Sequence, residues 1–204
     1  KQAQAFEYPH KQATSLAMKY SVSALDGIDD DAVNRFEEAE KRGTAYHKVR
    51  QYIDYFVSGE KEVENQMDML VKSNVLTAEE IASVDAKDIA ACLESDIMQI
   101  AREAEKKGRC FREQAFMMYK KASDVSSEFS SDDRVLVQGV IDLFINDEKK
   151  IIVDFKTSAL KDEKTVEKYK KQLYLYKSAV ESAIGAKVDE ILLYSFATGK
   201  TLKV

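Results

Sequence analysis

The sequence has few cysteines and no long apolar run, so little in it indicates secretion, disulfide bonding or membrane insertion. Its two cysteines, Cys92 and Cys110, have no metal-ligand spacing, so we expect free thiols in a reducing cytoplasm and no four-cysteine iron–sulfur cluster. No apolar run approaches the roughly 18–20 residues of a membrane helix, and the N-terminal residues lack the apolar core of a signal peptide. The chain starts at Lys1 rather than at methionine, so we expect a segment of a longer cytoplasmic protein without a membrane partner.

Positive charge is also scarce. The 204 residues include 31 Lys and Arg against 36 Asp and Glu, which gives a formal net charge of −5. Tight nucleic-acid binding depends on neutralising phosphates, so this balance argues against a self-sufficient nucleic-acid binder. It leaves room for a nuclease, because an acidic metal site lowers the net charge and a larger protein can deliver the substrate. The sequence has no internal repeats and no Gly-x-x-x-x-Gly-Lys-Ser/Thr loop, so helicase motifs are absent from it.

Two apolar segments in the second half of the chain predict a β-hairpin. Residues 135–145 and 151–155 have the composition of strands, and the polar, turn-prone residues 146–150 separate them. A turn centred on Glu148 would fix the register of the two strands.

That register brings two carboxylates and a lysine together. Asp142 lies directly opposite Asp154, where Cβ atoms are about 4.5–5.5 Å apart, and Lys156 shares the face of Asp154 because strand side chains alternate. Two carboxylates at that distance repel each other, and a divalent cation such as Mg²⁺ between them removes the repulsion. A lysine beside the cation can hold a phosphate or stabilise charge that develops on it. These parts fit metal-dependent phosphodiester hydrolysis.

A solvent-exposed hairpin with an ordinary Asp–Lys pair is the alternative interpretation. Here both acids interrupt apolar strands, and their same-face neighbours include Val140, Phe144 and Ile152. Charges on an apolar face cost free energy unless they are paired or bind a metal, so the surroundings favour the metal site.

The other elements follow from apolar periodicity and turn residues. We expect helices over residues 43–57, 87–107 and 162–184, a capping box over 77–80, a surface loop over 120–133, and strands over 111–119, 191–196 and 201–204. A helix, three antiparallel strands, a crossover helix and a further strand make a mixed sheet flanked by helices, of the α/β (or α+β) class. We divide the chain into a lead-in segment, residues 1–40, and one domain, residues 41–204, with a helical insertion over 60–107.

Two further residues lie one helical turn apart on the predicted crossover helix. Gln172 and Tyr176 share one face, because residues four apart are neighbours on a helix. By themselves they are typical of a boundary residue and a core residue. The helix follows the strand that carries Asp154 and Lys156, so its first turns can lean over the carboxylate pair.

In this order the motifs resemble the nuclease domain of the RecB-like branch of the PD-(D/E)xK superfamily. They are Gly43 to His47, Gly139-x-x-Asp142, Asp154-x-Lys156 and Gln172-x-x-x-Tyr176. Residues 19–25, 111–116 and 137–142 are further similar to the AddA (RexA) subunits of bacterial helicase–nucleases. The resemblance covers most of residues 19–198, is weakest over 60–107, and implies a restriction-endonuclease-like core.

The resemblance implies a metal site. Its ligands would be His47, Asp142, Asp154 and the backbone carbonyl of Phe155, whose side chain points to the other face. Mg²⁺ would be the cofactor, and Mn²⁺ can substitute for it. A coordinating histidine must be neutral, so metal binding should weaken as the pH falls through about 6.5. Without the family pattern, a lone histidine beside an apolar helical stripe is more typical of a boundary residue.

The resemblance also assigns roles around the metal. Lys156 would position the attacking water or stabilise the transition state. Gln172 and Tyr176 would support the site or touch DNA, and Glu113 would support it from the first strand of the hairpin sheet. The implied activity is a DNA exonuclease that degrades single strands delivered by a helicase, within a complex that processes double-strand ends for recombinational repair. The implied partners are helicase domains on the same longer chain and an AddB (RexB)-type subunit.

Two other function classes stay open. One is a catalytically silent nuclease-like module that binds DNA or a partner subunit, and the intact set of Asp142, Asp154 and Lys156 argues against it. The other is a structural docking domain, whose docking surface could be the mixed-charge helical insertion over residues 60–107. Exposed apolar residues in that insertion would support the docking domain.

Overall fold

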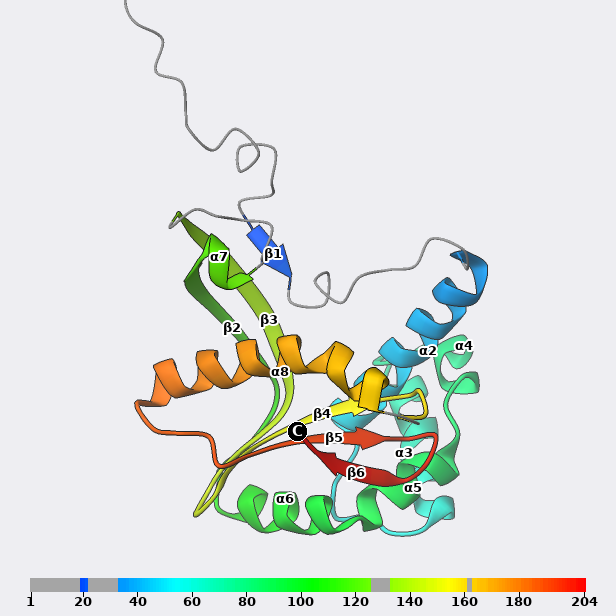
Figure 1. Ribbon diagram of the computed structural model, residues 1–204. Coiled ribbons are helices and arrows are strands. Elements are labelled where there is room, and N and C mark those ends of the chain that lie inside the picture. The colour runs from blue at the N-terminus through cyan, green and yellow to red at the C-terminus, as the bar shows by residue number, and fades with distance from the viewer. Residues whose placement is uncertain (1–18, 22–32, 126–132, 161–162) are drawn as a thin grey trace, which may run out of the picture.

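Figure 1 shows the computed structural model, which describes residues 19–21, 33–125, 133–160 and 163–204. The strands are β1 (Lys19–Ser21), β2 (Cys110–Lys121), β3 (Arg134–Asn146), β4 (Lys150–Lys156), β5 (Glu190–Ser195) and β6 (Lys200–Lys203). The helices are α2 (Val33–Tyr52), α3 (Glu60–Lys72), α4 (Ala78–Ala82), α5 (Ala86–Glu94), α6 (Asp96–Lys106), α7 (Ala122–Val125) and α8 (Glu163–Ile184). Among the described residues, no helix is both long enough and apolar enough to cross a bilayer.

The sheet is built around the antiparallel pair β3–β4. Beyond β4 it continues with β5, which runs parallel to β4, and then with β6, which runs antiparallel to β5. Helix α8 connects the parallel pair, as such a crossover requires. On one edge, β3 pairs with β2 along most of the length of β3. On its other edge, the start of β3 pairs with β1 and the end of β3 pairs with β4. The predicted mixed sheet flanked by helices is confirmed.

The β3–β4 hairpin has the predicted register. The ladder pairs run from Leu143 and Val153 to the turn, which centres on Glu148. One step further along the same register, Asp142 faces Asp154. A slip by one residue would turn every side chain of one strand to the other face, so the short turn fixes which residues meet.

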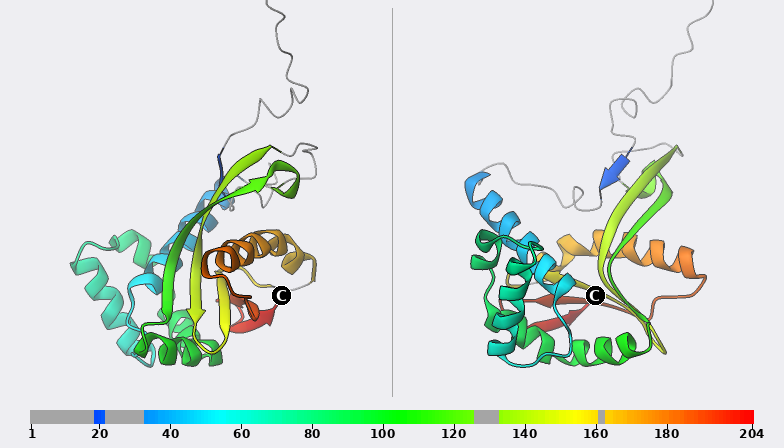
Figure 2. Two further views of the ribbon diagram at one scale, coloured as in Figure 1. Left: turned by 90° about the vertical axis from the view of Figure 1, so that its left-hand side faces the viewer. Right: turned by 180° about the vertical axis from the view of Figure 1, so that it is seen from behind.

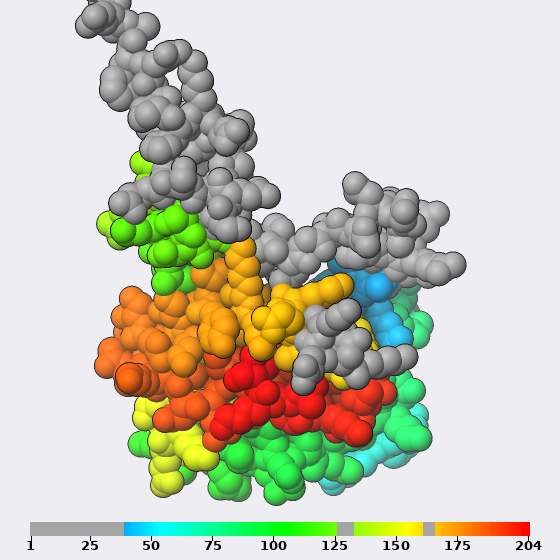
Figure 3. Space-filling model, viewed as in Figure 1, coloured from blue at the N-terminus to red at the C-terminus, as the bar shows by residue number. Residues whose placement is uncertain are grey.

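Helices cover both faces of the sheet and divide the core in two (Figure 2). On one face, Ile151, Val153 and Phe155 of β4 pack with residues of α2, α3, α5 and α6. On the other face Ile152 packs with residues of α8. In the space-filling view, α8 lies directly above the strands β5 and β6 on the side of the molecule that faces the viewer (Figure 3). Asp154 is therefore a charge within a strand whose neighbouring residues are all core.

Helix α2 differs from the helix predicted over residues 43–57 at both ends. It spans Val33–Tyr52, and its first half is rich in charged residues and has no apolar repeat, so periodicity gave no signal there. At its other end Arg112 of β2 donates hydrogen bonds to the carbonyls of Gln51 and Ile53, at 3.2 and 2.7 Å. A tertiary contact thus satisfies the carbonyls where the helix ends.

The single helix predicted over residues 87–107 is wrong, because α5 and α6 are separate helices that meet at Ser95. Ser95 has an extended backbone (φ −67°, ψ 156°), and its hydroxyl donates to the carbonyl of Cys92 at 2.6 Å. The break lets the apolar sides of both helices reach one core, and no Gly or Pro marks it. The predicted capping box is confirmed, because Thr77 and Glu80 exchange side-chain to backbone hydrogen bonds.

Candidate active site

Two buried carboxylates lie at the centre of the sheet. Asp142 on β3 is 6% exposed and Asp154 on β4 is 1% exposed. Asp142 Oδ2 accepts a hydrogen bond from the backbone N–H of Phe155 at 2.8 Å, which ties the strands together beyond the last ladder pair. Asp154 Oδ2 is buried and lies 3.0 Å from the ammonium nitrogen of Lys156. Carboxylates in such surroundings are stable as anions only beside cations.

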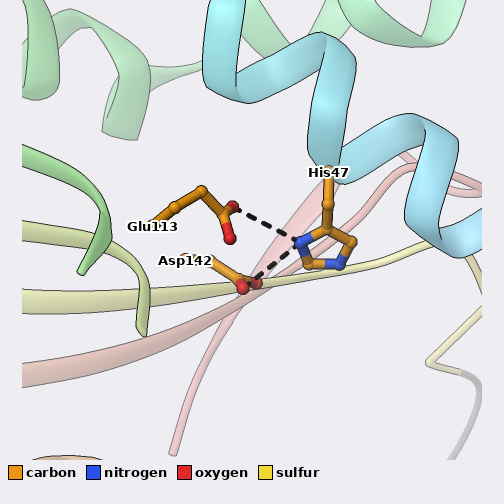
Figure 4. A group of neighbouring side chains, drawn as sticks. All are labelled: His47, Glu113 and Asp142. Atoms are coloured by element: carbon orange, nitrogen blue, oxygen red, sulfur yellow. Dashed lines mark ion pairs between the residues drawn. The ribbon is translucent and has the colours of Figure 1, made fainter. Parts of the chain in front are cut away.

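Helix α2 brings His47 to the first of these carboxylates (Figure 4). His47 Nδ1 lies 3.2 Å from Asp142 Oδ1 and 3.7 Å from Glu113 Oε1. One ligand atom from each of the three residues lies within 4.8 Å of the others, which is close enough to hold one metal ion. The structure thus places the predicted histidine beside Asp142 and brings Glu113 into the same group.

Glu113 reaches this group through an unusual backbone conformation. Its φ is +48°, in the left-handed region that residues other than glycine rarely adopt. In the β2–β3 register it stands opposite Asp142, where the ladder skips one pair. The alternation of side chains breaks at this kink, since Arg112 donates to the Gln51 carbonyl and Glu113 pairs with Arg50, both on α2. A period of two would have put these neighbours on opposite faces.

Lys156 lies on the other side of the carboxylate pair, next to α8. Its Nζ is 3.0 Å from Asp154 Oδ2, donates to Gln172 Oε1 at 3.2 Å, and lies 4.5 Å from the centroid of the Tyr169 ring. Gln172 Nε2 in turn donates to the Tyr176 hydroxyl at 2.9 Å. The pair of residues that was predicted to lie one turn apart on the crossover helix therefore forms a polar chain that ends on Lys156.

Most of the predicted site residues line one cleft of about 670 Å³, between α2, α8 and the β2–β3 ribbon. They are His47, Asp142, Asp154, Lys156, Gln172 and Tyr176. Glu113 is adjacent to the cleft through its contact with His47. The Phe155 side chain lies on the opposite face, in the core with Tyr194 and Phe196, as the alternation of β4 predicts.

The charged side chains in the cleft shift one another's pKa values. Burial acts to lower the pKa of His47, but the charge and hydrogen bond of Asp142 outweigh it and raise this pKa to about 10. Burial acts to raise the pKa of Asp142, and His47 holds it below its ordinary value instead. Burial raises the pKa of Asp154, with Lys156 opposing and the charge of Asp142 adding to the rise. Without a metal, the imidazole is therefore cationic at neutral pH.

The donor set suits a hard divalent cation. Carboxylate oxygens and an imidazole nitrogen are ligands for Mg²⁺ and Mn²⁺. Asp154 Oδ2 forms an ion pair with Lys156 at 3.0 Å, so a metal that binds Asp154 would share this carboxylate with the ammonium group. Among the described residues, the group whose ligand atoms lie close enough together to hold one ion consists of His47, Glu113 and Asp142 and does not include Asp154 (Figure 4). The set that the sequence predicts, with Asp154 in place of Glu113, stays a prediction.

A family model of the PD-(D/E)XK nuclease superfamily matches residues 15–201. The chain belongs to this superfamily. The match includes every strand and helix that lines the cleft, and members of the superfamily use divalent metals. The metal-compatible donor set of the cleft agrees with this membership.

Curated relatives of this nuclease domain are each named as one subunit of an ATP-dependent helicase/nuclease. The protein of Clostridium acetobutylicum is 31% identical over 98% of this chain, and that of Syntrophomonas wolfei is 30% identical over 98%. The protein of Alkaliphilus oremlandii is 34% identical over 78% of this chain. The chain spans only 18%, 18% and 14% of these relatives. A solved structure titled "Crystal structure of SSO0001" covers 95% of this chain and 71% of its own, with a TM-score of 0.39 and 14% identity.

One residue of this nuclease domain that sequence reasoning missed is Arg50, one turn after His47 on α2. Its side chain is 2% exposed and forms an ion pair with Glu113. It donates a hydrogen bond to the Tyr55 hydroxyl at 3.2 Å, and its guanidinium lies 4.5 Å from the centroid of the Phe155 ring. The spacing of three from His47 is the only signal in the sequence that could have placed it near the site.

We expect Arg50→Met to lower the free energy of unfolding by about 2 kcal/mol, because the ion pair of the buried guanidinium with the half-buried Glu113 and its hydrogen bond to Tyr55 are lost. Urea denaturation in EDTA measures this. Arg109→Met is the matched control, since Arg109 is exposed and pairs with Asp147 at the surface, so little change is expected. Adding Glu113→Gln to Arg50→Met should recover part of the loss. Equal losses in the two arginine variants would contradict a stabilising role for the buried pair.

Proposed function

We propose that this nuclease domain hydrolyses phosphodiester bonds in DNA with Mg²⁺ in the cleft. The observation that carries the proposal is the buried pair Asp142 and Asp154, with His47 on one side and Lys156 on the other. Charges on an apolar sheet cost free energy unless they are paired or bind a metal, and here both ion pairs, His47 with Asp142 and Lys156 with Asp154, line the cleft. Together they can hold a divalent cation and stabilise a phosphate.

The proposed metal ligands are His47, Asp142, Asp154 and the backbone carbonyl of Phe155. Mn²⁺ should replace Mg²⁺, because imidazole and carboxylate ligands suit it. When bound, the ion would supply an acidified water and a Lewis acid for the phosphate. Glu113 is proposed as a supporting residue, because its Oε1 lies 3.7 Å from His47 Nδ1, the same nitrogen that faces Asp142.

The chain's own residues have separate tasks in the proposed reaction. Lys156 holds its ammonium group between Asp154 and Gln172, so its charge is preorganised for a phosphate in the cleft. Gln172 fixes the position of that ammonium group, and the Tyr176 hydroxyl fixes Gln172. This arrangement stabilises negative charge on the phosphoryl oxygens without reorganisation during the reaction.

The relatives suggest the wider setting. We propose that the chain, divided into a lead-in over residues 1–40 and a nuclease domain over 41–204, is the cytoplasmic nuclease part of a longer helicase–nuclease. It would act as an exonuclease on single strands that the helicase delivers, during the processing of double-strand ends. An AddB (RexB)-type subunit would be the partner. Exposed Met69 and Ile100 in the helical segment 60–107 are compatible with docking to such a partner.

Cleavage of end-labelled single-stranded DNA by the purified chain tests the proposal. We expect cleavage with Mg²⁺ or Mn²⁺, none in EDTA, and recovery when excess Mg²⁺ is added. A linear strand should be degraded while a circular strand survives, because an exonuclease needs an end. Cleavage that persists in EDTA would contradict metal dependence. Absence of both cleavage and calorimetric metal binding would favour the silent nuclease-like module.

Metal affinity should rise with pH over a higher range than the ordinary histidine value suggests. The pKa of His47 is raised to about 10, so a metal that coordinates its nitrogen must displace a proton at neutral pH. Below that pKa the apparent affinity should rise by up to about tenfold per pH unit. Calorimetric titration with Mg²⁺ between pH 7 and 9, in buffers of different ionisation enthalpy, measures the affinity and the released proton. His47→Asn should flatten the profile. A flat wild-type profile would remove His47 from the ligand set.

A further inference from the structure

One face of the β2–β3 ribbon carries a row of exposed side chains that leads away from the active cleft. The row begins at the level where Glu113 stands opposite Asp142. The pairs that follow on the same face are Ala115–Val140, Met117–Gln138 and Tyr119–Leu136. Met117 is 66% exposed, Tyr119 61% and Val140 42%.

The other face of the ribbon is turned toward α8 (Figure 2). There the Phe116 ring meets the Tyr176 ring edge-on with centroids 5.7 Å apart, and Met118 packs against the core beneath α8. Lys120 donates a hydrogen bond to the Ser178 hydroxyl of α8. The alternation of β2 therefore sends Met117 and Tyr119 away from α8, to the open face of the ribbon.

The exposed row is continuous with the active cleft. Met117, Gln138 and Val140 line the same cavity as Asp142 and Lys156. From Asp142 the row extends along β3 to Leu136, which is six residues (142 − 136) and about 20 Å at the rise of a strand.

The far end of the row carries positive charge. The Arg134 guanidinium lies 5.3 Å from the centroid of the Tyr119 ring. In the strand register Arg134 stands opposite Lys121, at the end of the ribbon. A solvent-exposed aromatic ring beside a guanidinium is suited to a nucleobase and its phosphate, because every base has a face that stacks and every phosphate is an anion.

We propose that this row is a stacking track that guides single-stranded DNA to the active cleft. The inference rests on the proposed nuclease function and adds the path of the substrate. Stacking does not depend on net charge, so the track explains how an acidic chain can hold a nucleic acid strand. A strand stacked at 3.4 Å per nucleotide needs about six nucleotides to span from Asp142 to Tyr119, so only longer strands use the whole track.

Equilibrium binding of a fluorescein-labelled dT12 strand tests the track. Anisotropy is measured in EDTA, so that no hydrolysis takes place. Tyr119→Ala should weaken binding about 5- to 20-fold, since one base–aromatic stack is lost, and Tyr119→Phe should bind like the wild type. Tyr174→Ala is the matched control, because Tyr174 is 56% exposed but lies on α8, beside Lys120 and away from the row. The dissociation constant of Tyr119→Ala divided by that of the wild type should grow as the strand lengthens from dT3 to dT12.

The outcomes separate this inference from the proposed function. Equal affinity of wild type and Tyr119→Ala for dT12, or no dT12 binding at all, would overturn the track whatever the cleavage assay shows. An absence of both metal-dependent cleavage and calorimetric metal binding, together with a length-dependent loss of affinity in Tyr119→Ala, would keep the track and reject the nuclease. In an active protein, Tyr119→Ala should raise the KM for dT12 more than it lowers kcat.

Discussion

Asp154→Asn should lower the rate of single-strand cleavage by a factor on the order of 10³ or more, with the fold intact. Asparagine has nearly the shape of aspartate, but it lacks the negative charge and the second anionic oxygen, which in the wild type pairs with Lys156. The rate is measured with saturating Mg²⁺, and metal binding is measured by calorimetry on the same samples. Binding should weaken together with the rate.

Asp68→Asn is the control for this variant. Asp68 is exposed on α3, far along the chain from the strands that carry the site, so its loss should change neither the rate nor the metal affinity. A near-normal rate in Asp154→Asn would contradict the assignment of the metal site. Circular dichroism of both variants confirms that a lost rate is not a lost fold.

Lys156→Met should lower kcat by about 10²- to 10³-fold, the usual effect of losing one preorganised donor in an active site. Its effect on metal affinity should be opposite to that of Asp154→Asn. Removing the ammonium group 3.0 Å from Asp154 leaves that carboxylate free for the metal, so Mg²⁺ should bind as tightly as in the wild type or more tightly. Single-turnover cleavage and calorimetry measure the two quantities.

Lys149→Met is the matched control, because Lys149 is 67% exposed in the hairpin turn and pairs with Glu190 at the surface. It should leave both quantities unchanged. If Lys156 only stabilised the fold, Lys156→Met would lower both the cleavage rate and the metal affinity. That outcome would contradict a role in charge stabilisation. A wild-type rate in Lys156→Met would do the same.

The part of the site that could be predicted depends on local rules. The register of β3 and β4 follows from a short polar turn, and it alone brings Asp142 opposite Asp154. The chain from Gln172 to Tyr176 follows from the helical period. These rules relate residues that are near one another in sequence, which is why the central motifs could be placed before the structure was known.

The part that could not be predicted depends on contacts between distant segments. Glu113 reaches His47 only because its left-handed backbone interrupts the alternation of β2. Arg50 reads as an ordinary surface arginine until β2 places Glu113 beside it. The end of α2 is likewise set by Arg112, and no propensity of the helix itself encodes that contact.

The pH range expected for metal binding assumed an ordinary histidine pKa, and the structure contradicts that assumption for the same reason. A transition near pH 6.5 assumes an isolated imidazole, whereas the described structure places Asp142 Oδ1 3.2 Å from His47 Nδ1. That contact joins α2 to β3 across nearly a hundred residues of sequence, so the pKa of about 10 could not be anticipated from the residues around His47. The direction of the dependence, with tighter binding at higher pH, is unchanged.

Anomalous diffraction from crystals of this chain soaked in Mn²⁺ would test the central claim most directly. The account predicts a manganese peak in the cleft with His47, Asp142 and Asp154 in its coordination shell and the Phe155 carbonyl oxygen beside them. The peak should vanish in Asp154→Asn crystals grown and soaked alongside. A peak held by His47, Glu113 and Asp142 without Asp154 would contradict the ligand set, and a cleft without any peak would contradict the metal centre itself.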